Sequence, residues 1–353
     1  MLPSGLRARL AELYPGATID RVTPLGDDET TSGEVMKALG YGRPLRIDVR
    51  EGDDVRALVF HTARPDEFGH DRRSDRLGNL VLAYDSFNHI PRHVVAIDVG
   101  AVRDDGQLIS LGSTGEPYLL TTWVDGTLYA DELRRIATTG MVSKLDIMRV
   151  DQLTRLMLKI HSAPGTHPLA YTRAIRDLLG HGEGIFGLVD SYPPSALTKR
   201  LRAIEEACLA WRWKLRDRTE RLRRTHGDFH PFNIVCGDDI TLLDASRGSE
   251  GDPADDAACL SINFLFFGVG HPNWSTGLGK LWDRFWQIYL ASDRVDVLAA
   301  VAPFFAWRAL VLASPIWYPH TSDADRDRIL RFAERVLYAE RFDPAWGAEA
   351  MAE

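Results

Sequence analysis

Residues 225–244 constrain the fold more than any other part of this 353-residue chain. They read Thr-His-Gly-Asp-Phe-His-Pro-Phe-Asn, followed by two short apolar runs, the second of which ends at Asp244. Residues 237–239, Gly-Asp-Asp, have the composition of a turn between the two runs, so the segment is predicted to form a β-hairpin. A hairpin returns Asp244 to the neighbourhood of Asn233.

Asp228, Asn233 and Asp244 are the residue types that phosphoryl transfer from ATP to a hydroxyl requires. One carboxylate receives the hydroxyl proton, and further oxygen ligands hold Mg²⁺ against the phosphates. Asp228 is predicted for the first role. Asn233 and Asp244 are predicted for the second, because Mg²⁺ accepts one or two protein oxygens alongside substrate phosphates. Each residue alone is more often a turn former or a helix cap.

The motif resembles that of the aminoglycoside phosphotransferase and choline kinase-like family. His226-Gly227-Asp228 with Asn233 is similar to the family's catalytic loop, and Asp244 is similar to the Asp of the protein-kinase Asp-Phe-Gly element. Residues 251–258 resemble the family's Gly-Asp-Pro-x-x-Asp-Leu-Ala stretch. The resemblance spans roughly residues 18–340. It implies that ATP and Mg²⁺ are the cofactors and that Asp256 steadies the catalytic loop.

The resemblance also implies an α+β, protein-kinase-like fold of two lobes. Residues 1–121 are predicted to be a small β-rich nucleotide-binding lobe with a short helix within residues 1–16. Its strands are expected at 19–25, 35–39, 45–49, 55–62, 94–102, 108–111 and 118–122, with a helix at 71–87. Residues 122–126 are predicted to be a hinge, where main-chain groups of Thr122 and Val124 hydrogen-bond a purine.

Residues 127–353 are predicted to form a larger, mostly helical lobe that holds the catalytic hairpin and the acceptor. Apolar residues recur at helical spacing at 145–160, 197–211, 257–267, 278–290, 295–313 and 323–338. Ser143 is expected to cap the first of these helices. Asp252 and Pro253 are expected to cap and begin another.

The small lobe departs from the family pattern at His61, which stands where related kinases carry the Lys that pairs with ATP phosphates. His61 itself could contact phosphate, or Lys37 could reach the phosphates from the preceding strand. Alternatively, the lobe binds nucleotide poorly and the protein is a pseudokinase, or His61 is a strand histidine satisfied by a neighbour. Residues 26–33, expected to cover the phosphates, contain three acids whose role stays open.

Two further groups have competing interpretations. Arg247 could brace the transferring phosphoryl group, bind an anionic substrate, or pair with Glu250 or Asp252 in the turn. His226 is expected to order the loop. Acidic residues interrupt the arginine cluster 216–224, which favours a solvated face over an anion patch.

The glycine pattern at 182–187 follows a predicted helix, whereas a dinucleotide site requires a preceding strand. It is therefore predicted to be a loop.

Composition limits the partners. A net charge of −8 argues against nucleic acid. The most apolar stretch, 297–307, is shorter than the ~20 residues of a membrane span. Three cysteines without CxxC spacing, and no signal-peptide pattern in residues 1–16, favour a reducing, cytoplasmic location. The sequence leaves the oligomeric state open.

These patterns predict an ATP- and Mg²⁺-dependent phosphotransferase that transfers the γ-phosphoryl group in line to a small-molecule hydroxyl. Glu183, Asp255 and Asp283 could pair with an amine, so an aminoglycoside, amino sugar or other amine-bearing alcohol is the expected acceptor. Aromatic residues of the helical lobe could hold a ring, although such stripes are usually core: Phe264, Phe267, Trp274, Trp282, Trp286, Phe305, Trp307, Trp317 and Tyr318. The alternatives are a nucleotide-binding pseudokinase and a kinase-fold protein that phosphorylates or AMPylates a protein.

Overall fold

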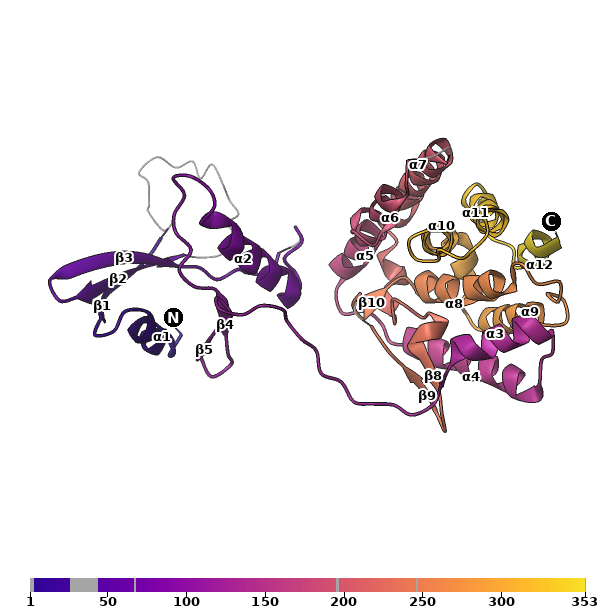
Figure 1. The fold of residues 1–353 in the computed structure, drawn as a ribbon, viewed down its shortest axis with the longest axis horizontal. Helices are drawn as coiled ribbons and strands as arrows, with labels where there is room; N and C mark the ends of the chain where they lie inside the picture. The colour runs from indigo at the N-terminus through magenta and orange to yellow at the C-terminus, as the bar shows by residue number, and fades with distance from the viewer. Residues whose placement is uncertain (1–2, 26–43, 67, 195–196, 246, 353) are drawn as a thin grey trace. The chain divides into compact units, whose positions relative to one another are not determined.

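The computed structural model describes residues 3–25, 44–66, 68–194, 197–245 and 247–352. Helices and strands both contribute to it, which confirms the mixed α+β class. The chain divides into two units, Met1–Thr121 and Thr122–Glu353 (Figure 1). Each unit has its own buried apolar cluster.

The first unit is built on a three-stranded antiparallel sheet in the order β1-β2-β3. Glu51 pairs with Asp54 across a two-residue turn. Gly52 in that turn has a φ of 62°, a left-handed conformation that glycine adopts without steric cost. The turn therefore fixes the register of the second and third strands. The strands are β1 (Thr18–Pro24), β2 (Leu45–Glu51) and β3 (Asp54–Phe60).

Helix α1 (Leu6–Leu13) packs against this sheet through Leu6 and Leu10, which are buried with Ile47 and Val49. Arg9 of the same helix donates to Asp98 (Nε to Oδ2, 2.7 Å). The small unit is thus held by one apolar cluster and a half-buried ion pair. It is completed by α2 (Arg73–Phe87) and the hairpin of β4 (Gly100–Val102) and β5 (Leu108–Ser110).

The structure confirms most elements predicted for this unit and corrects two. The helices, and the strands at 19–25, 45–49, 55–62 and 108–111, are present within a few residues. The strand expected at 94–102 is limited to Gly100–Val102. The strand expected at 118–122 is wrong, because these residues form no ladder and Leu119 and Leu120 are exposed. Their apolar content alone suggested a strand, whereas a strand needs a partner. The strand predicted at 35–39 lies outside the described residues.

The second unit is a helical assembly around α8, into which the short strands of the predicted catalytic hairpin are inserted (Figure 1). Its helices are α3 (Tyr129–Thr139), α4 (Lys144–His161), α5 (Pro168–Gly180), α6 (Ile185–Ser191), α7 (Thr198–Leu215), α8 (Pro253–Gly268), α9 (Leu278–Leu290), α10 (Ala302–Leu312), α11 (Asp323–Leu337) and α12 (Trp346–Ala352). The strands are β6 (Thr127–Leu128), β7 (Arg223–Arg224), β8 (Ile234–Cys236), β9 (Ile240–Leu242) and β10 (Glu250–Gly251). Single turns of 3₁₀ helix occur at Thr219–Arg221, Pro231–Asn233 and Val295–Ala299.

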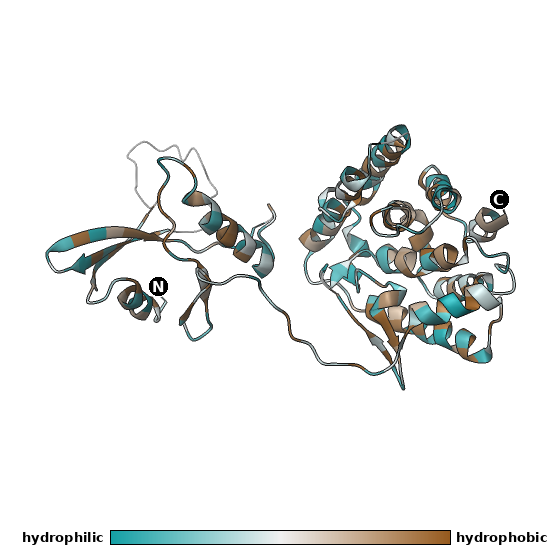
Figure 2. Cartoon of the chain, in the orientation of Figure 1, coloured by the Kyte–Doolittle hydropathy of each residue, from teal (hydrophilic) through white to brown (hydrophobic). Residues whose placement is uncertain are grey.

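Helix α8 is buried along almost its whole length, and α10 packs against it. Figure 2 shows the hydrophobic colour gathered on these two helices. A helix that is apolar on all sides belongs in the interior of a domain. Most of the aromatic residues considered as a ligand cage are in fact core: Phe264, Phe267, Trp282, Trp286, Phe305 and Trp307 are buried.

The predicted helices of this unit are confirmed, with one division. The expected helix at 295–313 is a 3₁₀ turn followed by α10, with Pro303 in the first turn of α10. Ser143 caps α4 as predicted, accepting from Asp146 N. Residues 182–187 follow helix α5 and not a strand, as predicted, but the predicted loop ends at Gly184, because helix α6 begins at Ile185. No helix among the described residues has both the length and the apolar character needed to cross a bilayer.

Asp252 anchors the start of α8 and has a buried cation beside it. It accepts from Ala254 N (2.9 Å), as expected for a cap, and from the hydroxyl of Tyr171 (2.9 Å). Arg221 donates twice to the same carboxylate, from Nε (2.7 Å) and Nη2 (2.8 Å). Asp252, Tyr171 and Arg221 are all buried, so water does not readily replace either member of the Asp252–Arg221 ion pair.

We expect Arg221→Ala to lower the free energy of unfolding by ~3–5 kcal/mol, because it leaves the Asp252 carboxylate buried without its cation. Arg218→Ala is the matched control. Arg218 pairs with Glu220 at the surface, and losing an exposed pair costs ~0–1 kcal/mol. Urea unfolding followed by circular dichroism measures both variants, and equal losses would contradict the assigned role of Arg221.

Candidate active site

The segment that carries Asp228 begins and ends at a short two-stranded antiparallel ladder. Strand β7 pairs antiparallel with β10, and Thr225 N donates to Ser249 O (3.0 Å) just beyond them. The chain between these points contains the predicted catalytic loop and the hairpin of β8 and β9. The two ends of this segment are therefore held next to each other in the second unit.

Asp256, in the first turn of α8, holds the loop from below. Its carboxylate accepts from the main-chain N–H groups of His226 (2.8 Å) and Gly227 (2.8 Å), and from His161 Nε2 (3.0 Å). Burial would raise the pKa of Asp256, but these hydrogen bonds outweigh it and hold the pKa below its usual value. Gly227 has a φ of 81°, so a residue with a side chain would be strained at this bend.

Asp228 follows the bend, and nitrogen atoms of three side chains donate to its carboxylate, besides the more distant thiol of Cys259 (Sγ to Oδ1, 3.8 Å). Arg308 Nη1 (2.6 Å) and Arg247 Nη1 (3.1 Å) donate to Oδ1, and Asn233 Nδ2 donates to Oδ2 (3.1 Å). Burial would raise the pKa of Asp228, but the charges of Arg308 and Arg247 outweigh burial and lower the pKa. The carboxylate therefore stays ionised well into the acid range and is a weak base with a fixed orientation.

The predicted hairpin is present, and it returns Asp244 to Asn233. Ile234 pairs with Leu242 in the ladder of β8 and β9, and Leu243 N donates to Asn233 O (2.8 Å). Asp244 is the next residue and has a φ of 51°. A left-handed non-glycine residue is uncommon and costs conformational energy. The chain therefore makes a sharp change of direction at the residue predicted to bind metal.

The donor atoms at this hairpin fit a magnesium ion. The Asn233 side-chain nitrogen donates to Asp228 O (3.2 Å) and Asp228 Oδ2, and Oδ1 is the amide atom outside those two bonds. Asp244 is solvent-exposed. Among the described residues, no group of three or more His, Cys, Asp or Glu side chains could hold a metal ion. A cation here would rely on Asn233, Asp244 and phosphate oxygens, a ligand set that suits Mg²⁺.

Arg247 lies at the exposed edge of this site. Besides Asp228, it contacts Glu183 (Nη2 to Oε2, 3.1 Å) and lies over the Trp307 ring, 4.7 Å from its centroid. The structure thus pairs Arg247 with Glu183 and Asp228, and not with the Glu250 or Asp252 considered from the sequence. Glu183 is anchored in turn because its main-chain oxygen accepts from Trp307 Nε1 (2.6 Å).

Both histidines of the loop accept hydrogen bonds from main-chain N–H groups of the same loop. His226 Nδ1 accepts from Asp228 N (3.3 Å), and its ring packs edge-on against Phe229. His230 Nδ1 accepts from Phe232 N (3.2 Å), and burial lowers the pKa of His230 to about 4. His230 is therefore neutral near pH 7 and supplies no positive charge for a phosphate.

The remaining predicted nucleotide contacts lie elsewhere in the chain. His61 is exposed and comes directly after β3. Thr122 and Val124 lie in a segment without helix or strand at the start of the second unit. Lys37 is outside the described residues. The roles assigned to these four residues stay predictions.

Sequence reasoning missed Arg308, the buried cation of the site. Its Nη2 donates to Asp255 Oδ1 (2.6 Å) and Gly227 O (2.9 Å), in addition to the Nη1 bond to Asp228. Asp255, considered as an amine-binding acid, is therefore already paired, although burial still raises its pKa to about 6. The only signal for Arg308 was its position, a single cation directly after the most apolar run in the chain.

Comparison with known proteins agrees with this geometry. Residues 86–298 match the model of the phosphotransferase enzyme family (APH), which is more than half of the chain. The chain belongs to this family. It is a small-molecule kinase, for which ATP is the phosphate donor. The comparison with curated proteins gives no match.

Several solved structures resemble the chain at low sequence identity. A microcompartment-associated aminopropanol kinase is 15% identical over 94% of each chain, with a TM-score of 0.38. A glucosamine kinase is 16% identical over 100% of this chain and 97% of its own, with a TM-score of 0.37. The choline kinase LicA from Streptococcus pneumoniae is 14% identical over 94% of this chain and 97% of its own, with a TM-score of 0.33.

We expect Arg308→Gln to raise the pKa of Asp228, because the largest opposing charge is removed while the carboxyl stays half-buried. The carboxylate would then take up its proton at a higher pH than in the wild type. Arg308→Lys, which keeps the charge, should give a smaller rise. Carbon-13 NMR titration of labelled aspartate measures the change, with Asp228→Asn to assign the resonance. An unchanged titration in Arg308→Gln would contradict the electrostatic role.

Proposed function

We propose that this protein transfers the γ-phosphoryl group of ATP to the hydroxyl of a small amine-bearing alcohol, with Asp228 as the catalytic residue. The observation that carries the proposal is the arrangement at the hairpin. Asp228 and Asn233 are hydrogen-bonded, and Asp244 directly follows the residue that bonds back to Asn233. Family membership supports the reaction class, and this arrangement supports the assignment of residues.

Asp228 would orient the acceptor hydroxyl and receive its proton. Its lowered pKa makes it a poor base toward an unreacted alcohol. Proton transfer to it becomes favourable only as the new bond to phosphorus forms and the alcohol oxygen loses electron density. This fits a loose transition state, in which positioning and electrostatics carry most of the catalysis. Arg308 fixes the direction in which the carboxylate faces.

Asn233 and Asp244 would hold Mg²⁺, which neutralises charge on the phosphates when bound. In this proposal residues 1–121 supply nucleotide contacts, with His61 or Lys37 in place of the usual Lys and with Thr122 and Val124 at the purine. Residues 127–353 supply the catalytic groups and the acceptor site.

Glu183 is the acid best suited to an amine of the acceptor. Asp255 is paired with buried Arg308, whereas the Glu183 side chain keeps 56% of its surface exposed. It is connected to Asp228 through Arg247, which contacts both carboxylates. An amine at Glu183 would therefore bind beside the group that orients the hydroxyl. An aminoglycoside, an amino sugar and a simpler amino alcohol all carry this pair of groups.

We expect Asp228→Asn to lower kcat by about 10²- to 10⁴-fold, the usual contribution of a general base. Asp238→Asn, in the exposed turn of the same hairpin, is the control and should keep wild-type activity. A panel of amines, sugars and antibiotics assayed for ADP release, followed by mass spectrometry of the products, identifies the acceptor. Phosphate on a protein, AMP on a protein, or no turnover with any acceptor would each contradict the proposal.

The metal assignment has a separate test. Asp244→Asn should raise the Mg²⁺ concentration for half-maximal activity by at least about tenfold, since even outer-shell partners of a metal change affinity by about 10- to 100-fold. Asp239→Asn, which is exposed in the hairpin turn, should leave the Mg²⁺ dependence unchanged. Activity lost in EDTA should return with added Mg²⁺. An identical Mg²⁺ requirement in Asp244→Asn would place the metal on other residues.

A further inference from the structure

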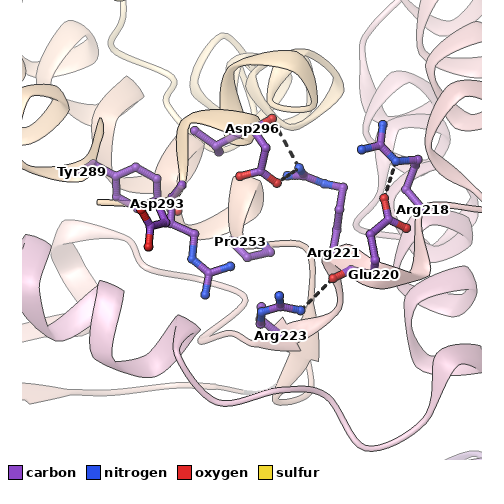
Figure 3. A pocket seen from close by; sticks show the side chains of 10 residues that line it. Arg218, Glu220, Arg221, Arg223, Pro253, Tyr289, Asp293 and Asp296 are labelled. Atoms are coloured by element: carbon purple, nitrogen blue, oxygen red, sulfur yellow. Dashed lines mark hydrogen bonds and ion pairs between the residues drawn. The ribbon is translucent and has the colours of Figure 1, made fainter. Parts of the chain in front are cut away.

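A cavity of about 300 Å³ lies beside the start of α8, away from the hairpin of β8 and β9. Figure 3 shows Tyr289 and Asp293 on one side of it, Arg218, Glu220 and Arg221 on the other, and Pro253 between them. Arg223, Arg294, Asp296 and Val297 complete the lining. This volume is at the lower end of pockets that hold small molecules.

Four arginines line this cavity, and they differ in their partners. Arg218 pairs with Glu220, and Arg221 pairs with Asp252 and Asp296. Arg223 and Arg294 are half-buried and have no such partner: in the described part of the chain, neither is paired with a carboxylate. Arg223 donates to the main-chain oxygens of Glu220 and Leu222, and Arg294 donates to that of His161.

The prediction that the arginine cluster 216–224 is a solvated face therefore holds for only some of its arginines. Arg216 and Arg218 form exposed pairs with neighbouring acids. Arg223 instead faces a cavity whose other uncompensated cation, Arg294, comes from a segment about 70 residues later in the chain. Asp293 is the one lining acid without a pairing cation among the described residues, and it is exposed at the surface. Two half-buried cations thus oppose one solvated acid.

We propose that this cavity binds a small phosphate-bearing anion, with Arg223 and Arg294 as its principal ligands. A guanidinium group matches the geometry of phosphate oxygens and binds them through two parallel N–H donors. Each of these two arginines has further N–H donors besides those that bond to main-chain oxygens. The volume leaves room for a short organic group beside the phosphate, so a small phosphate ester fits the site.

The wall of this cavity is connected to the catalytic loop. The hydroxyl of Tyr289 lies 3.2 Å from His161 Nδ1, and Arg294 Nη2 donates to His161 O (2.7 Å). His161 contacts Asp256, which accepts the N–H groups of His226 and Gly227. His161 is therefore the single residue between Arg294, which would bind the anion, and Asp256, the carboxylate that holds the loop.

Isothermal titration calorimetry of the full chain with inorganic phosphate and with glycerol 3-phosphate tests the proposal without using activity. The wild type should bind glycerol 3-phosphate saturably and inorganic phosphate more weakly. The double variant Arg223→Gln/Arg294→Gln should lose about tenfold or more in affinity, because charge-assisted bonds from two cations are removed. Arg216→Gln, which changes the same cluster outside the cavity, should bind as the wild type does.

Three results would overturn the proposal: no saturable binding to the wild type, unchanged affinity in the double variant, or an equal loss in Arg216→Gln. Phosphate bound at the catalytic hairpin would persist in the double variant, so the two sites are distinguished. Should the double variant fail to fold, as judged by circular dichroism, Arg223→Gln alone carries the test. Tighter binding of citrate than of either phosphate probe would assign the cavity to carboxylates and contradict the phosphate class.

Discussion

The second unit depends on the way the first turn of α8 pairs its three carboxylates. Asp252 is the N-cap of α8, and Asp255 and Asp256 follow in its first turn, where the helix dipole favours negative charge. Asp252 and Asp256 are buried and Asp255 is half-buried, which is costly unless each acid has its own partner. Arg221 partners the first, Arg308 of α10 the second and His161 of α4 the third. Because each partner comes from a different element, one helical turn connects α4, α10 and the 3₁₀ turn Thr219–Arg221, which precedes β7.

The position of the loop follows from this arrangement. Asp256 uses one oxygen for Gly227 N and the other for His226 N and His161. Arg308 donates to Asp255, Gly227 O and Asp228. The Asp228 carboxylate is therefore connected, through Arg308, to the same turn of α8. Main chain and side chain of the loop are thus fixed by neighbouring carboxylates of α8. The adjacent acids differ in character: hydrogen bonds lower the pKa of Asp256, whereas burial raises that of Asp255.

Sequence reasoning found what depends on spacing within a segment. The hairpin that returns Asp244 to Asn233, the cap at Asp252 and the helices of the second unit all follow from turn composition and periodicity over a few residues. Arg308 was missed because its contact with Asp228 spans 80 residues, and no local pattern connects a cation at the end of an apolar helix with a distant loop. The strand expected at 118–122 was wrong for the same reason, since apolar residues favour a strand only where a partner strand exists.

The two arginines on Asp228 suit different tasks. The Arg308 side chain keeps 6% of its surface exposed and also donates to Asp255 and Gly227 O, so releasing Asp228 would leave a buried cation with fewer partners. The Arg247 side chain keeps 28% exposed, and its other contacts, Glu183 and the Trp307 ring, do not require Asp228. We propose that Arg247 turns from the carboxylate toward a phosphoryl oxygen, a movement that would leave no buried charge without a partner. With Arg308 still in place, Asp228 would keep its orientation while one cation becomes available where negative charge develops on the transferring group.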